Sequence, residues 1–427
     1  MRETIEYIIR FLLHGNDDLL CRVGYTRDAA LFPQYDVVIL PSPFFDEGVY
    51  GTLQSEPSLP LPTIGDTPIL FGSPEVEQVG STKVVHADLV ASAYFLISRY
   101  EEYLHPDRHR DAHGRFSGRE SLPYRAGFLL RPILDEYSLL LLGWLSESAS
   151  VSFPSPGYEQ IYLTHDIDRI AYYRNPRGFL GGIKRNLTSF PGLKNVLKAP
   201  LRLANDPAYT FPWIIEMDKK VKGAQSIYFV KSAIRQHAND LPSYSLARKD
   251  FKRLYTLLKA NHALFGLHTS YHSGEHTETI PQEKKQLEEA IDCPISLNRW
   301  HFLRTLRPSD FNVLIDAGIH DDFTMGYADT VGFRLGTSRC VRWIDPRSRC
   351  VTNLRLHPLV AMDCSLSNSY YMNLTEEEAT NTLLTLLAQI KKHHGEVVLL
   401  WHNTVFSPVE GGYHPSLYQT IIEELSK

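Results

Sequence analysis

Short apolar runs alternate with helix-period segments from residue 161 to the end of the chain. This alternation predicts a mostly parallel sheet, because each helix carries the chain back to start the next parallel strand. About seven such strands favour a distorted (β/α) barrel, whose chemistry sits at the C-terminal strand ends. The expected strands are Ile161–Thr164, Ser226–Val230, Ala263–His268, Ile295–Asn298, Asp321–Thr324, Leu356–Met362 and Val397–Trp401. The expected helices are Arg248–Asn261, Pro281–Ile291, Pro308–Ala317, Thr375–His393 and Pro415–Leu425.

The first 150 residues follow a different pattern, typical of a smaller α/β unit. The proline-containing segment Ser152–Gly157 separates this unit from the barrel pattern and indicates a linker. We therefore predict an N-terminal α/β accessory domain over residues 1–150 and a catalytic barrel over residues 158–427. Within the accessory domain we expect helices near Glu3–Leu13, Ala87–Leu104 and Arg131–Ser148, and strands at Asp36–Leu40 and Thr67–Phe71.

Composition and net charge limit the partners and the compartment that we expect for this chain. The net charge of −5 gives no reason to expect nucleic acid as a partner. The richest apolar run, Tyr137–Leu145, is too short for a transmembrane segment, and the acidic start does not match a secretory signal. Five scattered cysteines without a Cys-x-x-Cys motif favour reduced thiols. These features predict a cytoplasmic protein and leave its oligomeric state open.

Two polar strings follow expected strands, Thr164–Asp168 and His268–His272. Asp166 and Asp168 are two residues apart, so in a strand both point to the same side. The two histidines are four apart, so a helical turn would bring both rings to one side. Two histidines and one carboxylate leave open positions on a metal, as catalytic sites do. The second carboxylate is then a candidate general base.

Three further strings at strand ends place titratable groups beside aromatic residues. They are Asn298–Phe302, Asp321–Tyr327 and Leu399–Asn403. An arginine near a carboxylate base keeps that base ionised, and a histidine opposite the metal could protonate a leaving amine. Aromatic faces suit sugar rings, although core packing explains them equally well.

The order of these motifs resembles the polysaccharide deacetylase (NodB-like, carbohydrate esterase 4) family over roughly residues 158–427. The longer strings Asp322–Gly326, Gly332–Arg334 and Leu400–Asn403 resemble a bacterial branch of this family that carries an extra N-terminal domain. The chain has Thr-His-Asp-Ile-Asp where the family most often has Thr-Phe-Asp-Asp-Gly. It has Arg299–Phe302 where the family has Arg-x-Pro-Tyr, the segment whose backbone amide helps to hold the oxyanion.

The resemblance implies a role for each motif residue. Asp166 would be the base, His402 the acid, and Arg299 the partner of the base. Asp322 would tune His402, with Asp321 and Asp329 as competing candidates for that role. The implied cofactor is a divalent metal, zinc first and cobalt or nickel as alternatives. Its implied ligands are Asp168, His268 and His272.

These residues predict a metal-dependent hydrolase that removes N-acetyl groups from an amino sugar in a glycan or glycan precursor. A metal-activated water would attack, with Asp166 as base and His402 as acid. Two alternatives stay open. One is a non-catalytic carbohydrate-binding homologue. The other is a different metal enzyme on the same barrel, because two histidines and one carboxylate also suit Fe(II) oxygen chemistry.

Overall fold

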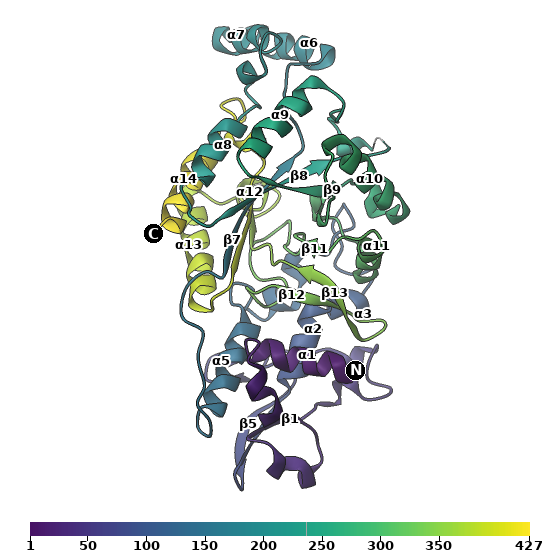
Figure 1. Ribbon diagram of the computed structural model, residues 1–427, viewed down its shortest axis with the longest axis vertical. Coiled ribbons are helices and arrows are strands. Elements are labelled where there is room, and N and C mark those ends of the chain that lie inside the picture. Colours follow the sequence, from purple (N-terminus) through teal and green to yellow (C-terminus); the bar gives the residue numbers. More distant parts are fainter. Residues whose placement is uncertain (236) are drawn as a thin grey trace.

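A curled nine-stranded sheet forms the centre of the molecule (Figure 1). The computed structural model describes residues 1–235 and 237–427. The strand order is β12-β13-β11-β10-β9-β8-β7-β15-β14, and every neighbouring pair is parallel except β12 with β13. The bounds are β7 (Gln160–Ile167), β8 (Gln225–Lys231), β9 (Leu264–Thr269), β10 (Leu297–Trp300), β11 (Asp321–Asp322), β12 (Val341–Asp345), β13 (Cys350–Leu356), β14 (Ala361–Met362) and β15 (Glu396–Leu400).

The sheet differs from the expected seven-stranded barrel in number and at its edges. The β12–β13 hairpin adds an antiparallel edge, and β14 is the opposite edge. The expected strand Leu356–Met362 is divided, because β13 ends at Leu356 and β14 begins at Ala361. Pro358 lies in the gap, where it has no N–H to donate to a strand ladder.

Helices between the strands lie close to their expected positions. They are α9 (Lys249–Ala260), α10 (Ile280–Ile291), α11 (Phe311–Asp316), α13 (Glu376–Lys392) and α14 (His414–Leu425). The start of α13 is fixed by a capping box between Thr375 and Glu378. Three helices between β7 and β8 were not expected: α6 (Pro176–Arg185), α7 (Phe190–Lys198) and α8 (Phe211–Asp218). A short helix, α12 (Asp363–Ser367), follows β14.

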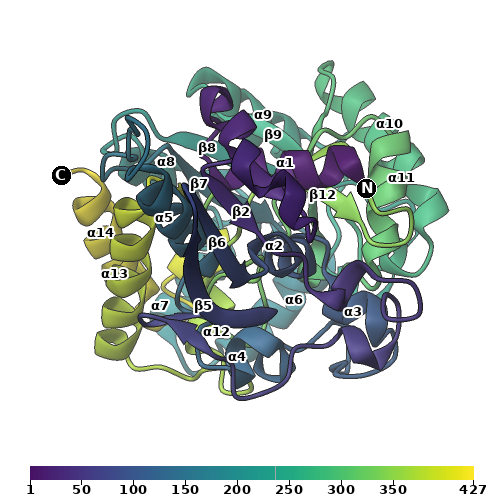
Figure 2. The ribbon, with the colours of Figure 1, turned by 90° about the horizontal axis from the view of Figure 1, so that it is seen from below.

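The N-terminal unit is built on a four-stranded sheet of order β1-β2-β6-β5. The expected helix Ala87–Leu104 is interrupted at Arg99, whose φ of 57° is left-handed, so it forms α2 and α3. When the molecule is viewed from the end formed by the N-terminal unit, α1, β2, β6 and β5 lie in front of the nine-stranded sheet (Figure 2). The strands are β1 (Val23–Tyr25), β2 (Val37–Ile39), β5 (Gly72–Val79) and β6 (Thr82–Ala87), with a separate pair β3 (Thr63–Ile64) and β4 (Thr67–Pro68). The helices are α1 (Arg2–Leu12), α2 (Leu89–Ile97), α3 (Tyr100–Leu104), α4 (Leu122–Arg125) and α5 (Ile133–Leu145).

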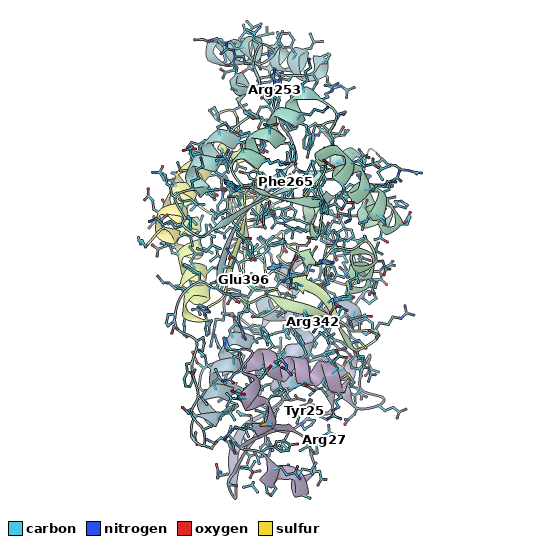
Figure 3. The ribbon with its side chains drawn as sticks, in the orientation of Figure 1. Tyr25, Arg27, Arg253, Phe265, Arg342 and Glu396 are labelled. Atoms are coloured by element: carbon cyan, nitrogen blue, oxygen red, sulfur yellow. The ribbon has the colours of Figure 1, made fainter. Side chains whose placement is uncertain are left out.

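One hydrophobic core runs through both parts of the chain. Buried residues of α1, α2 and α5 belong to the same contiguous cluster as those of β13 and α13. A buried ion pair between Arg339 and Asp135 at 2.9 Å joins the two parts. Tyr25 and Arg27 lie within the N-terminal unit, while Arg342 and Glu396 lie nearer the middle of the molecule (Figure 3). In the described part of the chain, no helix is long and apolar enough to cross a bilayer.

Candidate metal centre

Polar side chains from adjacent parallel strands meet at the C-terminal edge of the barrel sheet. The end of β7 brings Asp166 and Asp168, and β9 brings His268. His301 follows β10 and His402 follows β15. Strand alternation turns His165 the other way, where its Nε2 lies 3.2 Å from the Asp218 carboxylate behind the sheet. The edge therefore collects carboxylates and imidazoles from four strands.

Asp168, His268 and His301 place one ligand atom each within 4.8 Å of one another. Oδ1 of Asp168 lies 3.5 Å from Nε2 of His268 and 3.1 Å from Nε2 of His301. Atoms about 2.0–2.1 Å from a tetrahedral zinc are separated by about 3.3 Å. The three atoms thus have the spacing of ligands around one small cation.

Hydrogen bonds on the far side of each ring aim the two Nε2 atoms at Asp168. His268 donates from Nδ1 to the carbonyl of Arg299 at 3.0 Å, because a carbonyl can only accept. Its Nε2 is buried and has no hydrogen-bond partner among the described residues. His301 pairs through Nδ1 with Asp240 at 2.9 Å. Such outer carboxylate and carbonyl partners are typical of metal-binding histidines, so the residues fit a divalent cation.

Positive groups already surround Asp168. Burial would raise the pKa of Asp168, but the His301 ring and the Lys231 ammonium hold that pKa well below its usual range. Lys231, at the end of β8, places Nζ 3.5 Å from Oδ1 of Asp168. Burial would lower the pKa of His301, but Asp168 and Asp240 raise it. A cation at this position would therefore replace a proton on His301 and share Asp168 with Lys231.

Asp166 is held beside this group by a buried arginine. Arg299 donates to Oδ1 of Asp166 at 3.1 Å and to Thr164 Oγ1 at 2.7 Å. Its guanidinium also lies 4.5 Å from the ring centroid of Phe229. Oδ2 of Asp166 faces Nε2 of His268 at 3.5 Å. One carboxylate oxygen is thus fixed by Arg299, and the other faces the candidate metal position.

His402 lies beside Oδ2 of Asp168, whereas His268 and His301 lie beside Oδ1, and its ring is held by Asp363. Its Nδ1 lies 2.9 Å from Oδ1 of Asp363, and its backbone N–H donates to Oδ2 at 2.7 Å. Its Nε2 lies 3.6 Å from Asp168. Burial would lower the pKa of His402, but the Asp363 carboxylate raises it well above its usual range.

Asp322, the residue expected to tune His402, occupies a different place. Its carboxylate accepts from Asn298 Nδ2 at 2.8 Å and from Thr324 Oγ1 at 2.9 Å. It lies on β11, whereas His402 follows β15 on the far side of β7. The structure therefore brings Asp363 rather than Asp322 to the imidazole.

His272, the second histidine of the string, lies outside the three-residue group. Its ring stacks on His276 with centroids 4.3 Å apart. The strand β9 ends at Thr269, and a 3-10 turn begins at His272, so the ring leaves the line of the strand. Buried Asp240 accepts from the backbone N–H groups of Tyr271 and His272 while it also holds His301. In the structure His301, and not His272, completes the group with Asp168 and His268.

A buried glutamate on α10 anchors the same turn. Glu283 accepts from the backbone N–H of Ser270 at 3.0 Å and from the Ser270 and Ser273 hydroxyls. Burial raises the pKa of Glu283 to about 7, against the lowering effect of these donors. The folded chain therefore keeps a proton on Glu283 that the unfolded chain loses near pH 4.5.

We expect Glu283→Gln to remove a pH-dependent loss of stability. The Glu283 contribution is complete below pH 4.5 and is lost as the pH rises to about 7. The shift corresponds to about 3 kcal/mol. Urea unfolding at pH 5 and pH 7.5 should show the wild type losing about 2 kcal/mol of this contribution relative to Glu283→Gln. Glu289→Gln, exposed on the same helix, is the control and should follow the wild type. A pH-independent gap between Glu283→Gln and the wild type would refute the prediction.

A loop of the N-terminal unit reaches the segment after His301. Arg115 donates to the carbonyl of Phe302 at 2.9 Å, and His113 Nδ1 lies 3.2 Å from the Tyr271 hydroxyl. Phe302 and Leu303 have φ values of 62° and 53°, in the left-handed region that non-glycine residues rarely adopt. Contacts from outside the barrel therefore support the strained backbone next to a candidate ligand.

Three residues of this centre were missed as site residues. His301 and Asp363 each follow an expected strand, so the rule that selected Asp166 and His402 also applied to them. Asp240 lies in a turn with no apolar strand before it, and the sequence carries no signal for it.

Comparisons with known proteins give one family model, no curated relative and weak structural likenesses. A family of unknown function, DUF7033, matches residues 3–150, roughly a third of the chain. No curated protein matches the sequence. One similar solved structure is a candidate polysaccharide deacetylase from Mycobacterium smegmatis, at 14% identity and a TM-score of 0.40, covering 65% of this chain and 89% of that one. Another is a mutant of a CE4 family pseudoenzyme with restored activity, at 13% identity and a TM-score of 0.30, covering 65% and 68%. At these scores neither likeness supports an inference about this chain.

Proposed function

We propose that the chain is a metal-dependent hydrolase that removes the N-acetyl group from an amino sugar of a glycan or glycan precursor. The observation that carries this proposal is the buried Nε2 of His268, which has no hydrogen-bond partner among the described residues and faces both Asp166 and Asp168. The motif resemblance adds the reaction class, because the same types of residue carry deacetylation in that family.

Asp168, His268 and His301 would hold the cation, for which zinc is the first choice and cobalt or nickel the alternatives. Nitrogen and carboxylate ligands in this number leave a zinc ion open to water or substrate. When bound, the cation would polarise the acetyl carbonyl and acidify a water molecule. The protein's own part is to aim both Nε2 atoms at this position, through the Arg299 carbonyl and the Asp240 carboxylate.

Asp166 would accept the proton of the attacking water. Its Oδ1 accepts a hydrogen bond from Arg299 at 3.1 Å, which fixes the orientation of the carboxylate. Its Oδ2 is the free basic oxygen and faces the metal position. A base that is fixed at one oxygen and free at the other needs no rearrangement before proton transfer.

His402 would protonate the departing amine. Asp363 fixes the Nδ1–H side of the ring, so Nε2 is turned toward the centre, 3.6 Å from Oδ2 of Asp168. Asp166 thus lies beside His268 and His402 beside Asp168, so a base and an acid both border the metal group, as hydrolysis of an amide requires. The C–N bond breaks, acetate leaves with the water oxygen, and the amine takes the proton from Nε2.

A second candidate, a carbohydrate-binding homologue without turnover, draws on one observation. The buried Lys231 ammonium lies 3.5 Å from Asp168 and already supplies a positive charge at the centre. If Lys231 satisfied Asp168 permanently, no divalent cation would be needed there. Metal titration of the purified protein distinguishes the two candidates.

A screen for acetate release tests the proposal. We expect purified protein loaded with Zn²⁺, Co²⁺ or Ni²⁺ to release acetate from at least one N-acetyl sugar, nucleotide sugar or oligosaccharide. Asp166→Asn should lower the rate by about 10²–10⁴-fold while metal still binds, because only the base is lost. Asp36→Asn, a partly exposed carboxylate of the N-terminal unit, is the matched control and should leave the rate unchanged. Protein that binds no metal and releases no acetate from the panel would refute the proposal.

A further inference from the structure

We propose that the helical hairpin formed by α6 and α7 docks the protein on the surface of an anionic phospholipid bilayer. The hairpin is inserted between β7 and α8 and forms one end of the molecule, opposite the N-terminal unit (Figure 1). It follows the C-terminal end of β7, which also carries Asp168, so the hairpin and the metal centre are connected to the same edge of the sheet. The inference does not depend on the deacetylase reaction.

The charge of this segment differs sharply from that of the whole chain. Residues 169–205 contain eight Lys and Arg residues and no Asp or Glu, in a chain whose net charge is −5. Arg174 is neutralised by Asp250 at 2.7 Å. Asp206, just beyond the segment, is buried and accepts from backbone N–H groups of Tyr172 and Tyr173. Six basic side chains are exposed: Arg177, Lys184, Arg185, Lys194, Lys198 and Arg202.

Leucines share the outward faces with these bases. On α6 and the turn after it, Leu180 and Leu187 are 65% and 68% exposed. On α7 and beyond it, Leu197 and Leu201 are 53% and 77% exposed. Lys194, Leu197 and Lys198 fall at i, i+3 and i+4, so one face of α7 carries both bases and a leucine, and Leu201 follows three residues after the helix ends.

The apolar residues on the inner face of the hairpin are already packed against the protein. Val196 and Ala199 of the α7 region pack with Tyr172, Tyr173 and Ala208 in a small core of their own, with Phe179 and Ile183 against it. The outward leucines are therefore not needed to hold the hairpin on the protein. Single exposed leucines are normal, but four in one segment interleaved with uncompensated bases are not.

An anionic bilayer surface complements this face in both respects. Leucines of an interfacial helix insert at the acyl boundary, while lysines and arginines contact the headgroups. Each Lys or Arg near an anionic surface strengthens binding several-fold, and salt weakens this term. A soluble acidic macromolecule would satisfy the charges but leave the leucines in water, so the leucines favour the bilayer.

Vesicle co-sedimentation of the full chain tests the proposal. We expect binding to phosphatidylcholine vesicles that contain roughly 30% phosphatidylglycerol, whose anionic surface attracts basic segments, and no binding to pure phosphatidylcholine. The double variant Lys194→Gln/Lys198→Gln should reduce the partition coefficient by about 30-fold. Leu197→Ser/Leu201→Ser should reduce it by about tenfold or more.

Matched controls come from exposed residues elsewhere. Lys219→Gln/Lys285→Gln removes two exposed lysines, and Leu53→Ser/Leu130→Ser removes two exposed leucines, and both should bind as the wild type does. Two results would overturn the proposal. One is wild-type protein that ignores anionic vesicles. The other is leucine-independent binding that soluble polyglutamate displaces, which would identify an acidic macromolecule as the occupant.

Discussion

Replacing His301 with alanine is expected to weaken zinc binding by about a hundredfold or more, whereas replacing His272 should change it by less than about threefold. His301 Nε2 lies 3.1 Å from Asp168 and is aimed by Asp240, so its loss removes one of three converging ligand atoms. His272 stacks on His276 outside the group. Competition with a chromophoric chelator, using metal-stripped protein, measures both affinities.

The histidine pair also separates two readings of the motif. The family resemblance implies His272 as a ligand, and the structure presents His301 instead. His268→Ala is the positive control, because both readings place His268 on the metal. His276→Ala is the matched control for loss of an exposed imidazole. If His272→Ala lost the metal and His301→Ala kept it, the observed three-residue group would not be the binding site.

Much of the curled nine-stranded sheet could be predicted because its signals are local. The runs that became β7, β8, β9 and β15 are continuous apolar stretches buried by helices on the outside, and such strands need no long-range information. The β12–β13 hairpin was missed because Arg342, Arg355 and neighbouring polar residues interrupt its apolar pattern. Its strands are stabilised by pairing with each other and by packing on α1, which only the folded chain supplies.

In the candidate site too, some residues could be predicted from local strand patterns and others only from contacts between distant segments. Asp166, Asp168 and His268 follow clear strands, and the sheet brings them together. The choice between His272 and His301 depends on how the chain turns after Thr269, which Asp240 and Glu283 determine from distant segments. The choice between Asp322 and Asp363 depends on strand order, because β14, and not β11, is the neighbour of β15. Spacing along the chain carries neither piece of information.

Asp363→Asn is expected to lower the rate of acetate release by about a thousandfold or more with little change in metal affinity. The comparable loss of a histidine-orienting aspartate in a serine protease is about 10⁴-fold. Oδ2 of Asp363 accepts the backbone N–H of His402 at 2.7 Å, so the oxygen of an asparagine would keep that bond. Its amide nitrogen would then face Nδ1, which would have to accept rather than donate. The ring could no longer carry both protons, and protonation of the leaving amine would fail.

The pH profile separates this positioning role from a merely structural one. Asp363 raises the pKa of His402 well above its usual range, against the effect of burial. Without that carboxylate the pKa of His402 falls, so the residual activity should decline at a lower pH than in the wild type. Asp322→Asn is the matched control, since Asp322 contacts Asn298 and Thr324 but no imidazole, and it should keep the rate within about tenfold. A rate loss in Asp322→Asn with a wild-type rate in Asp363→Asn would return the tuning role to Asp322.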